Sequence, residues 1–232
     1  MKTRRSRYHG HRFPVEIISY AIWVYHRFSM SFRDVEDLLA ERGIDVSYET
    51  IRRWCEKFGP DYVRKLKRRQ GQLGDTWYLD EVFVRINGQQ QYLWRAVDQD
   101  GDVIDILVQP RRDQRAAERF LRRLVRGQGR TPFRMVTDKL RSYGAARRRI
   151  FPGVTHDTGQ YANNRAELSH QPTRVRERQM RRFKSSRQAQ RVLSAHGIIT
   201  NLFRVGRQHL SARNHRLLRS RSFAIWRTVT TA

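Results

Sequence analysis

Three carboxylates stand at places in this sequence where acids are unusual and where they could hold a metal ion. Asp80 interrupts the apolar stretch 76–86 (TWYLDEVFVRI), whose residue pattern predicts a β-strand. Asp138 directly follows the apolar stretch 133–137 (FRMVT), and Glu167 lies in the segment NNRAELSH. Fifty-seven residues separate the first two acids, and 28 separate the last two. Carboxylates are the ligands that Mg²⁺ prefers, and a pair of such ions can act on phosphodiester bonds.

Each acid also has an ordinary structural explanation. Asp80 and Glu81 are neighbours on a strand, so they point to opposite faces, and alternation alone does not say which one faces a site. Asp138 is suited to cap a following helix, which we expect to start at the next residue, and Glu167 is suited to complete a capping box with Asn164. All three structural explanations would have to hold at once. That is harder to accept than any one of them, because the three acids occupy specific places in the predicted order of strands and helices.

The elements around the first two acids predict a mixed α/β domain. The expected order is strands 76–86, 91–97 and 103–108, a helix capped by Asp113, and strand 133–137. Asn87-Gly88 is a strong hairpin signal between the first two strands. Three antiparallel strands, a helix and a strand that ends in an acid follow the order of a ribonuclease-H-like core. From Asn163 onward the sequence looks mainly helical.

The first 70 residues instead predict an all-α unit. Apolar residues recur at helical spacing over 14–28. Capping and stop signals for two further helices follow at Ser31, Asp34, Gly43, Ser47 and Gly59-Pro60. Two short capped helices with a third behind them form the helix-turn-helix pattern, and an ordinary three-helix bundle with a polar face is the alternative.

In a helix-turn-helix unit, the second helix enters the major groove of DNA and presents its first exposed residues to the bases. In this sequence those residues are Tyr48, Glu49, Arg52 and Arg53. We expect Tyr48, Arg52 and Arg53 to contact DNA.

The composition supports a polyanionic partner. The 232 residues include 48 Lys and Arg against 22 Asp and Glu, a net charge of +26, while 38% apolar residues indicate a folded chain. Nucleic acid is the default partner, with ribosomal RNA or an acidic membrane surface as competitors. A single cysteine excludes a disulfide framework within one chain. No apolar run approaches the roughly 20 residues of a membrane span, and no signal-peptide core follows the N-terminus, so we expect a soluble cytoplasmic protein.

A dense basic segment follows the third acid. From Gln171 to the end, the chain carries 15 Lys and Arg and a single acid, Glu177. We expect six of these residues to hold DNA phosphates: Arg174, Arg176, Arg178, Arg181, Arg182 and Lys184. A solvated basic face is the alternative.

Three segments carry a resemblance to a known family: WYLDEVFVRINGQQQYLWRAVDQDG, VTDKLRSYGAA and NNRAELSHQPTRVRERQMRRFKS. They resemble the acidic-triad (DDE) transposases of compact bacterial insertion sequences, and most closely the family named for insertion sequences six and twenty-six. The resemblance covers nearly the whole chain. It implies a ribonuclease-H-like catalytic domain over residues 71–232, a helix-turn-helix domain over 1–70, and an enzyme that uses Mg²⁺ or Mn²⁺ to cut and join DNA at terminal inverted repeats.

Matched to the family's motifs, the catalytic and metal-binding acids are Asp80, Asp138 and Glu167. The third acid follows the second more closely than in many relatives, so Glu177 stays open as an alternative. The resemblance also implies double-stranded DNA, both element ends and target, as the partner, and a homo-oligomer on that DNA. Two other functions remain open: a DNA-binding protein without catalysis, such as a decayed transposase copy, and an RNA-binding or ribosomal protein.

Overall fold

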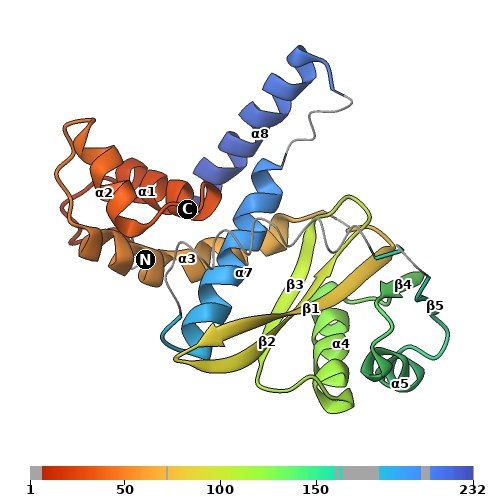
Figure 1. Ribbon diagram of the computed structural model, residues 1–232. Helices are drawn as coiled ribbons and strands as arrows, with labels where there is room; N and C mark the ends of the chain where they lie inside the picture. The colour runs from red at the N-terminus through yellow and green to blue at the C-terminus, as the bar shows by residue number, and fades with distance from the viewer. Residues whose placement is uncertain (1–6, 72, 160–161, 164–182, 205–209, 232) are drawn as a thin grey trace, which may run out of the picture. The chain divides into compact units, whose positions relative to one another are not determined.

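The computed structural model describes residues 7–71, 73–159, 162–163, 183–204 and 210–231, which form two compact units (Figure 1). The first unit comprises Met1–Arg69 and Leu202–Ala232, and the second comprises Gln70–Asn201. We expected everything after residue 70 to form one domain. The last segment belongs to the first unit instead, because its helix buries apolar side chains there. The division of functions between the units remains a proposal.

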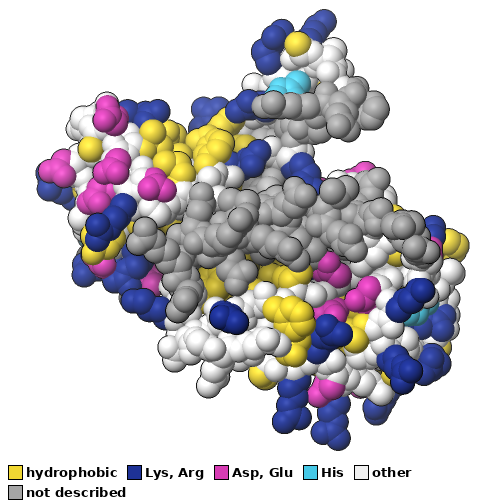
Figure 2. Space-filling view, viewed as in Figure 1, with side chains coloured by type: hydrophobic (Ala, Val, Ile, Leu, Met, Phe, Trp, Pro, Cys, Tyr) yellow, Lys and Arg dark blue, Asp and Glu magenta, His cyan; other side chains and the backbone are white. Residues whose placement is uncertain are grey.

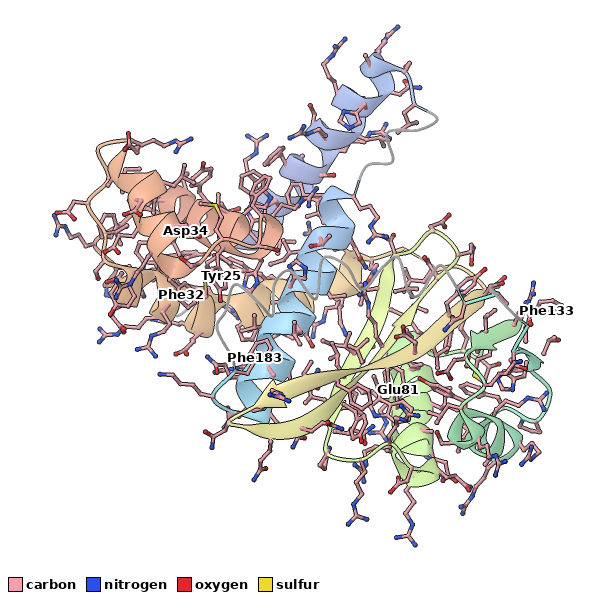
Figure 3. The ribbon with its side chains drawn as sticks, in the orientation of Figure 1. Tyr25, Phe32, Asp34, Glu81, Phe133 and Phe183 are labelled. Atoms are coloured by element: carbon pink, nitrogen blue, oxygen red, sulfur yellow. The ribbon has the colours of Figure 1, made fainter. Side chains whose placement is uncertain are left out.

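The first unit is helical, as expected. Its helices are α1 (Val15–Arg27), α2 (Phe32–Ala40), α3 (Tyr48–Arg69) and α8 (Ala212–Thr231). The expected capping box begins α2: the Ser31 hydroxyl accepts from the Asp34 amide at 3.1 Å, and the Asp34 carboxylate accepts from the Ser31 amide at 2.8 Å. Tyr25 of α1 stacks on Phe32 of α2, with ring centroids 4.1 Å apart (Figure 3). Among the α8 residues, Trp226 packs edge-on against Tyr62 of α3.

The expected end of the third helix at Gly59-Pro60 is wrong. α3 continues through Pro60 to Arg69. Phe58, Tyr62 and Leu66 are buried at intervals of four residues, so the apolar stripe continues past the proline and the packing of this stripe outweighs the lost backbone hydrogen bond.

The second unit is a five-stranded sheet in the order β3-β2-β1-β4-β5. Its strands are β1 (Thr76–Ile86), β2 (Gln89–Val97), β3 (Val103–Gln109), β4 (Arg134–Thr137) and β5 (Thr155–Asp157). β1, β2 and β3 pair antiparallel, whereas β4 pairs parallel with β1 and β5 pairs parallel with β4. This is the ribonuclease-H-like order expected from the sequence, with the strands at nearly the expected bounds.

Helices cover both faces of the sheet. They are α4 (Gln114–Gln128), α5 (Arg141–Ile150) and α7 (Ser186–Phe203), the last two residues of which belong to the first unit. One core joins Trp77 and Leu79 of β1 to Phe120 of α4 and Tyr143 of α5. The other core joins the opposite face of β1 to the start of α7, so β1 is buried on both sides.

α7 also covers the open edge of the sheet. Gln190 accepts a hydrogen bond from the Val108 amide of β3 at 2.9 Å, and Asn201 accepts one from the Val103 amide at 2.9 Å. These side chains satisfy backbone groups that an edge strand would otherwise leave unpaired. Gly197 permits this approach, since a Cβ there would lie 3.1 Å from a methyl group of Val103.

Candidate active site

Asp80 lies in the middle of β1 and is only 9% exposed. Its neighbours alternate between the two cores: Tyr78 and Val82 pack on the α7 side, and Leu79 packs on the α4 and α5 side. Because side chains alternate along a strand, Asp80 belongs to the α7 face and Glu81 to the opposite face. The two adjacent acids therefore have different surroundings.

Asp138 is level with Asp80 on the neighbouring strand. β4 runs parallel to β1 with Thr137 paired to Leu79, so the next residue of each strand is an aspartate. Neighbouring strands lie about 4.8 Å apart. The sheet thus brings together two acids that are far apart in the sequence, one buried and one exposed.

The turn after β4 orients Asp138. Its Oδ1 accepts a hydrogen bond from the Leu140 amide at 3.0 Å, and the preceding Thr137 hydroxyl lies 2.9 Å from His156 Nε2. α5 begins at Arg141, not directly after Asp138 as expected, and its N-cap residue makes no side-chain capping bond. The Asp138 carboxylate therefore closes a turn through Oδ1, and its Oδ2 takes no part in that hydrogen bond.

Glu81 is the most perturbed acid of this region, and its side chain is 2% exposed. Burial raises the pKa of Glu81 to about 7, and the negative charge of Asp138 adds to the rise. The Tyr143 hydroxyl and the Arg112 guanidinium, whose Nε is 3.4 Å from Glu81 Oε1, act in the opposite direction. Figure 3 labels Glu81 on the sheet, and Figure 2 shows acidic side chains gathered over the same part of the second unit.

Tyr143 connects these acids. It is fully buried in α5, and burial raises its pKa well above the ordinary value. The charges of Glu81, Asp80 and Asp138 all contribute to the same shift. The negative charges of Glu81, Asp80 and Asp138 therefore all act on the Tyr143 hydroxyl.

Arg95 is a residue that the sequence analysis missed. It is paired with Asp80 across β1 and β2 and is only 4% exposed. Residues directly opposite on neighbouring strands share a face, so a buried cation accompanies the buried aspartate. The hairpin signal at Asn87-Gly88 contained this information, because counting back from a two-residue turn fixes the register.

Asn163 ties the chain ahead of Glu167 to the same strand. Its buried side-chain amide donates to the carbonyl oxygen of Leu79 at 3.0 Å. Glu167 and its alternative Glu177 lie outside the described residues. In the part of the chain that the structure describes, no three side chains of metal-binding type are grouped as a metal site requires.

In the first unit, the expected DNA contacts lie at the start of α3. The Tyr48 amide donates to Glu36 of α2 at 3.0 Å, and the Arg33 guanidinium lies over the Tyr48 ring at 5.0 Å. Arg52 donates through Nε to Glu49 at 3.1 Å, while Arg53 is exposed. This pairing of Arg52 with an acid one turn earlier was not foreseen.

The expected phosphate contacts of the basic segment fall mostly outside the described residues. Those outside are Arg174, Arg176, Arg178, Arg181 and Arg182. Lys184 is described and exposed, and its backbone amide donates to Gln188 at 2.8 Å. Among the helices that can be described, none combines the length and the apolar character needed to cross a membrane.

Comparison with known proteins agrees with this architecture. The family described as a DDE domain matches residues 74–206, more than half of the chain. A transposase for the insertion sequence-like element IS431mec of Staphylococcus aureus (strain Mu50) is 29% identical over 86% of this chain and 89% of its own length. The transposase of IS257 in transposon Tn4003 of Staphylococcus aureus matches to the same extent.

Among solved structures, the catalytic core domain of BIV integrase matches 65% of this chain and 98% of its own, at 18% identity and a TM-score of 0.36. The family match over the second unit and the curated relatives over most of the chain agree with each other. The chain belongs to the DDE-type insertion-sequence transposases of the family named for insertion sequences six and twenty-six.

Proposed function

We propose that this transposase binds the terminal inverted repeats of its element and cuts and joins DNA through metal ions held by Asp80, Asp138 and Glu167. The observation that carries the proposal is the level position of Asp80 and Asp138 on the parallel pair β1 and β4. Two carboxylates on neighbouring strands, about 4.8 Å apart, repel each other unless a cation lies between them.

The chemistry of the donors suits Mg²⁺ or Mn²⁺. The groups are carboxylate oxygens, which hard divalent cations prefer, and the field of Asp138 already raises the pKa of Glu81. Such ions, when bound, activate an attacking water or 3′-hydroxyl and stabilise the leaving oxygen of a phosphodiester. Asp80 and Asp138 would hold and orient them, and Arg95 would limit the repulsion between the acids.

The reach of the chain favours Glu167 as the third ligand. Asn163 is hydrogen-bonded to Leu79, the residue before Asp80, and Glu167 follows Asn163 by four residues. Because four extended residues span at most about 14 Å, Glu167 is within about 14 Å of Asn163 along the chain. The chain returns to β1 at Phe183, which pairs with Ile86. Ile86 is six residues from Asp80 along β1, so these two residues are roughly 20 Å apart.

Glu177 precedes that second anchor, Phe183, by six residues. Six residues cover roughly 20 Å only when nearly fully extended, and a helix would cover about 9 Å. In the sequence, Glu177 also has arginines close on both sides, and these can neutralise it without metal. Both points support Glu167.

DNA recognition is proposed to lie in the first unit. We take α2 and α3 as the two helices of a helix-turn-helix motif, in which Tyr48, Arg52 and Arg53 would lie at the start of the second helix. The six basic residues from Arg174 to Lys184 are proposed to hold phosphates near the acids. Because two element ends must be joined to target DNA, we propose that a homo-oligomer acts on double-stranded DNA.

The test is a strand-transfer assay with labelled duplexes that carry the element's own terminal repeats. Products should form with Mg²⁺ or Mn²⁺, and neither with EDTA nor with scrambled ends. A chain that binds the repeats and forms no product under any of these metals would be a DNA-binding protein without catalysis, contrary to the proposal.

A further inference from the structure

An aromatic cluster joins three separate segments of the first unit. Trp23 of α1 contacts Phe203 at the end of α7, with ring centroids 5.5 Å apart, and Phe223 of α8, at 5.2 Å. Phe203 and Phe223 are 5.0 Å apart. The Ser222 hydroxyl donates to the Leu202 carbonyl at 2.7 Å and ties α8 to the end of α7. The relative positions of these segments are therefore fixed.

Each member of this cluster has an arginine close to it. Arg27 follows Trp23 by one helical turn, and Arg219 precedes Phe223 by one turn. Arg204 directly follows Phe203. The ring contacts therefore bring the backbone positions of these three arginines into one region of the first unit, although up to about 190 residues separate them in the sequence.

Burial and mutual repulsion make the positive charge of Arg27 unfavourable. Burial lowers the pKa of Arg27, which is partly buried, and the charges of Arg219 and Arg204 lower it further. In the described part of the chain, neither Arg27 nor Arg219 forms an ion pair with a carboxylate. α8 contains no acid, and Figure 2 shows basic side chains along its visible face.

We propose that Arg27, Arg204 and Arg219 form a binding site for one phosphate of the DNA backbone, separate from the residues at the start of α3. Guanidinium groups suit phosphate oxygens because they donate two parallel hydrogen bonds. The indole N–H of Trp23 is buried in the same cluster and has no acceptor among the described residues. A phosphate contact carries no sequence information, so this site fixes the register of the chain on DNA.

The site extends the proposed function and does not depend on cleavage. Its test is equilibrium binding of Arg27→Met and Arg219→Met to two duplexes, one with the terminal repeat and one of random sequence, over a range of salt. Both variants should lose affinity for both duplexes by the same factor, roughly tenfold. The slope of log affinity against log salt should fall by about 0.9.

A melting experiment separates binding from structure. Methionine keeps the apolar stem of arginine, and Arg27→Met removes the repulsion, so the DNA-free variant should melt at a higher temperature than the wild type. Arg227→Met is the matched control: it removes the same charge from α8, two turns beyond Arg219, and should leave both the salt slope and the melting temperature unchanged.

The proposal is wrong if Arg27→Met and Arg219→Met keep the wild-type salt slope. It is also wrong if both variants melt at a lower temperature than the wild type and their loss of DNA affinity follows that loss of stability. It is also wrong if millimolar inorganic phosphate stabilises the wild type against melting but not Arg27→Met, while duplex binding is unchanged. In that case the site binds a small anion and not DNA.

Discussion

The side-chain amide of Asn163 donates a hydrogen bond to the carbonyl oxygen of Leu79, at 3.0 Å. This bond connects the segment that leads to Glu167 with the residue directly before Asp80. Asn163, four residues before Glu167 in the sequence, is therefore fixed beside Asp80.

Asn163→Ala should reduce cleavage more than it reduces stability. Loss of a buried hydrogen bond costs about 1–3 kcal/mol of unfolding free energy, while the lost anchor should lower the single-turnover cleavage rate by roughly tenfold to a hundredfold. Asn201→Ala is the control, since it also removes bonds to a strand backbone, but at Val103, the first residue of β3, which β2 separates from β1. Assays run well below both melting temperatures should show a rate loss for Asn163→Ala alone; equal rates for the two variants would contradict the anchoring role.

Glu81 should make stability depend on pH. Its pKa is raised from 4.5 to about 7, so the folded chain binds this proton more tightly than the unfolded chain does, and the free energy of unfolding should fall as pH rises between these values. Glu81→Gln is neutral at every pH. In metal-free buffer the variant should be more stable than the wild type above pH 7, by up to about 3 kcal/mol, and similar to it near pH 4.

Denaturant unfolding from pH 4 to pH 9 measures this difference. A gap between Glu81→Gln and the wild type that stays constant with pH would show that burial and Asp138 do not control this carboxyl group.

Arg52→Ala should weaken binding to the terminal repeat by roughly 1–3 kcal/mol and weaken binding to random DNA much less, if Arg52 contacts a base. Glu49 holds the Arg52 guanidinium at the start of α3, which favours a fixed contact. Arg53→Ala removes the same charge from the next position and serves as the comparison. Equal losses on both DNAs in fluorescence titrations would make Arg52 a phosphate contact.

The pair Glu167→Gln and Glu177→Gln decides the third acid. Both changes keep the size of the side chain, and only Glu167→Gln should abolish Mg²⁺-dependent cleavage. Thermal melting should show that both variants are folded. Cleavage lost in Glu177→Gln and kept in Glu167→Gln would reverse the assignment.

Local patterns predicted most of the elements of this fold. Alternation and the Asn87-Gly88 turn predicted β1 and its hairpin, and the acid at position 34 predicted the start of α2. The course of α3 through Pro60 was missed, because tertiary burial of Tyr62 and Leu66 outweighs the local stop signal. Such packing is not visible in a local pattern.

The candidate site was predictable only in part, for the same reason. Asp80 and Asp138 were recognised by their positions in and after apolar strands. Tyr143 and Asn163 act through contacts with residues that are distant in the sequence, and neither has a local signature. The arginine cluster near Trp23 depends on the return of α8 to the first unit, which no local signal announced.

The most direct test of the account is strand transfer by Asp80→Asn and Asp138→Asn on terminal-repeat DNA with Mg²⁺. Asparagine keeps the shape but removes the charge that would hold the metal, so the rate should fall at least about a hundredfold while binding to the repeat is retained. Asp100→Asn, an exposed acid in the turn before β3, is the control and should transfer strands like the wild type. Strand transfer at the wild-type rate by either Asp80→Asn or Asp138→Asn would contradict the account.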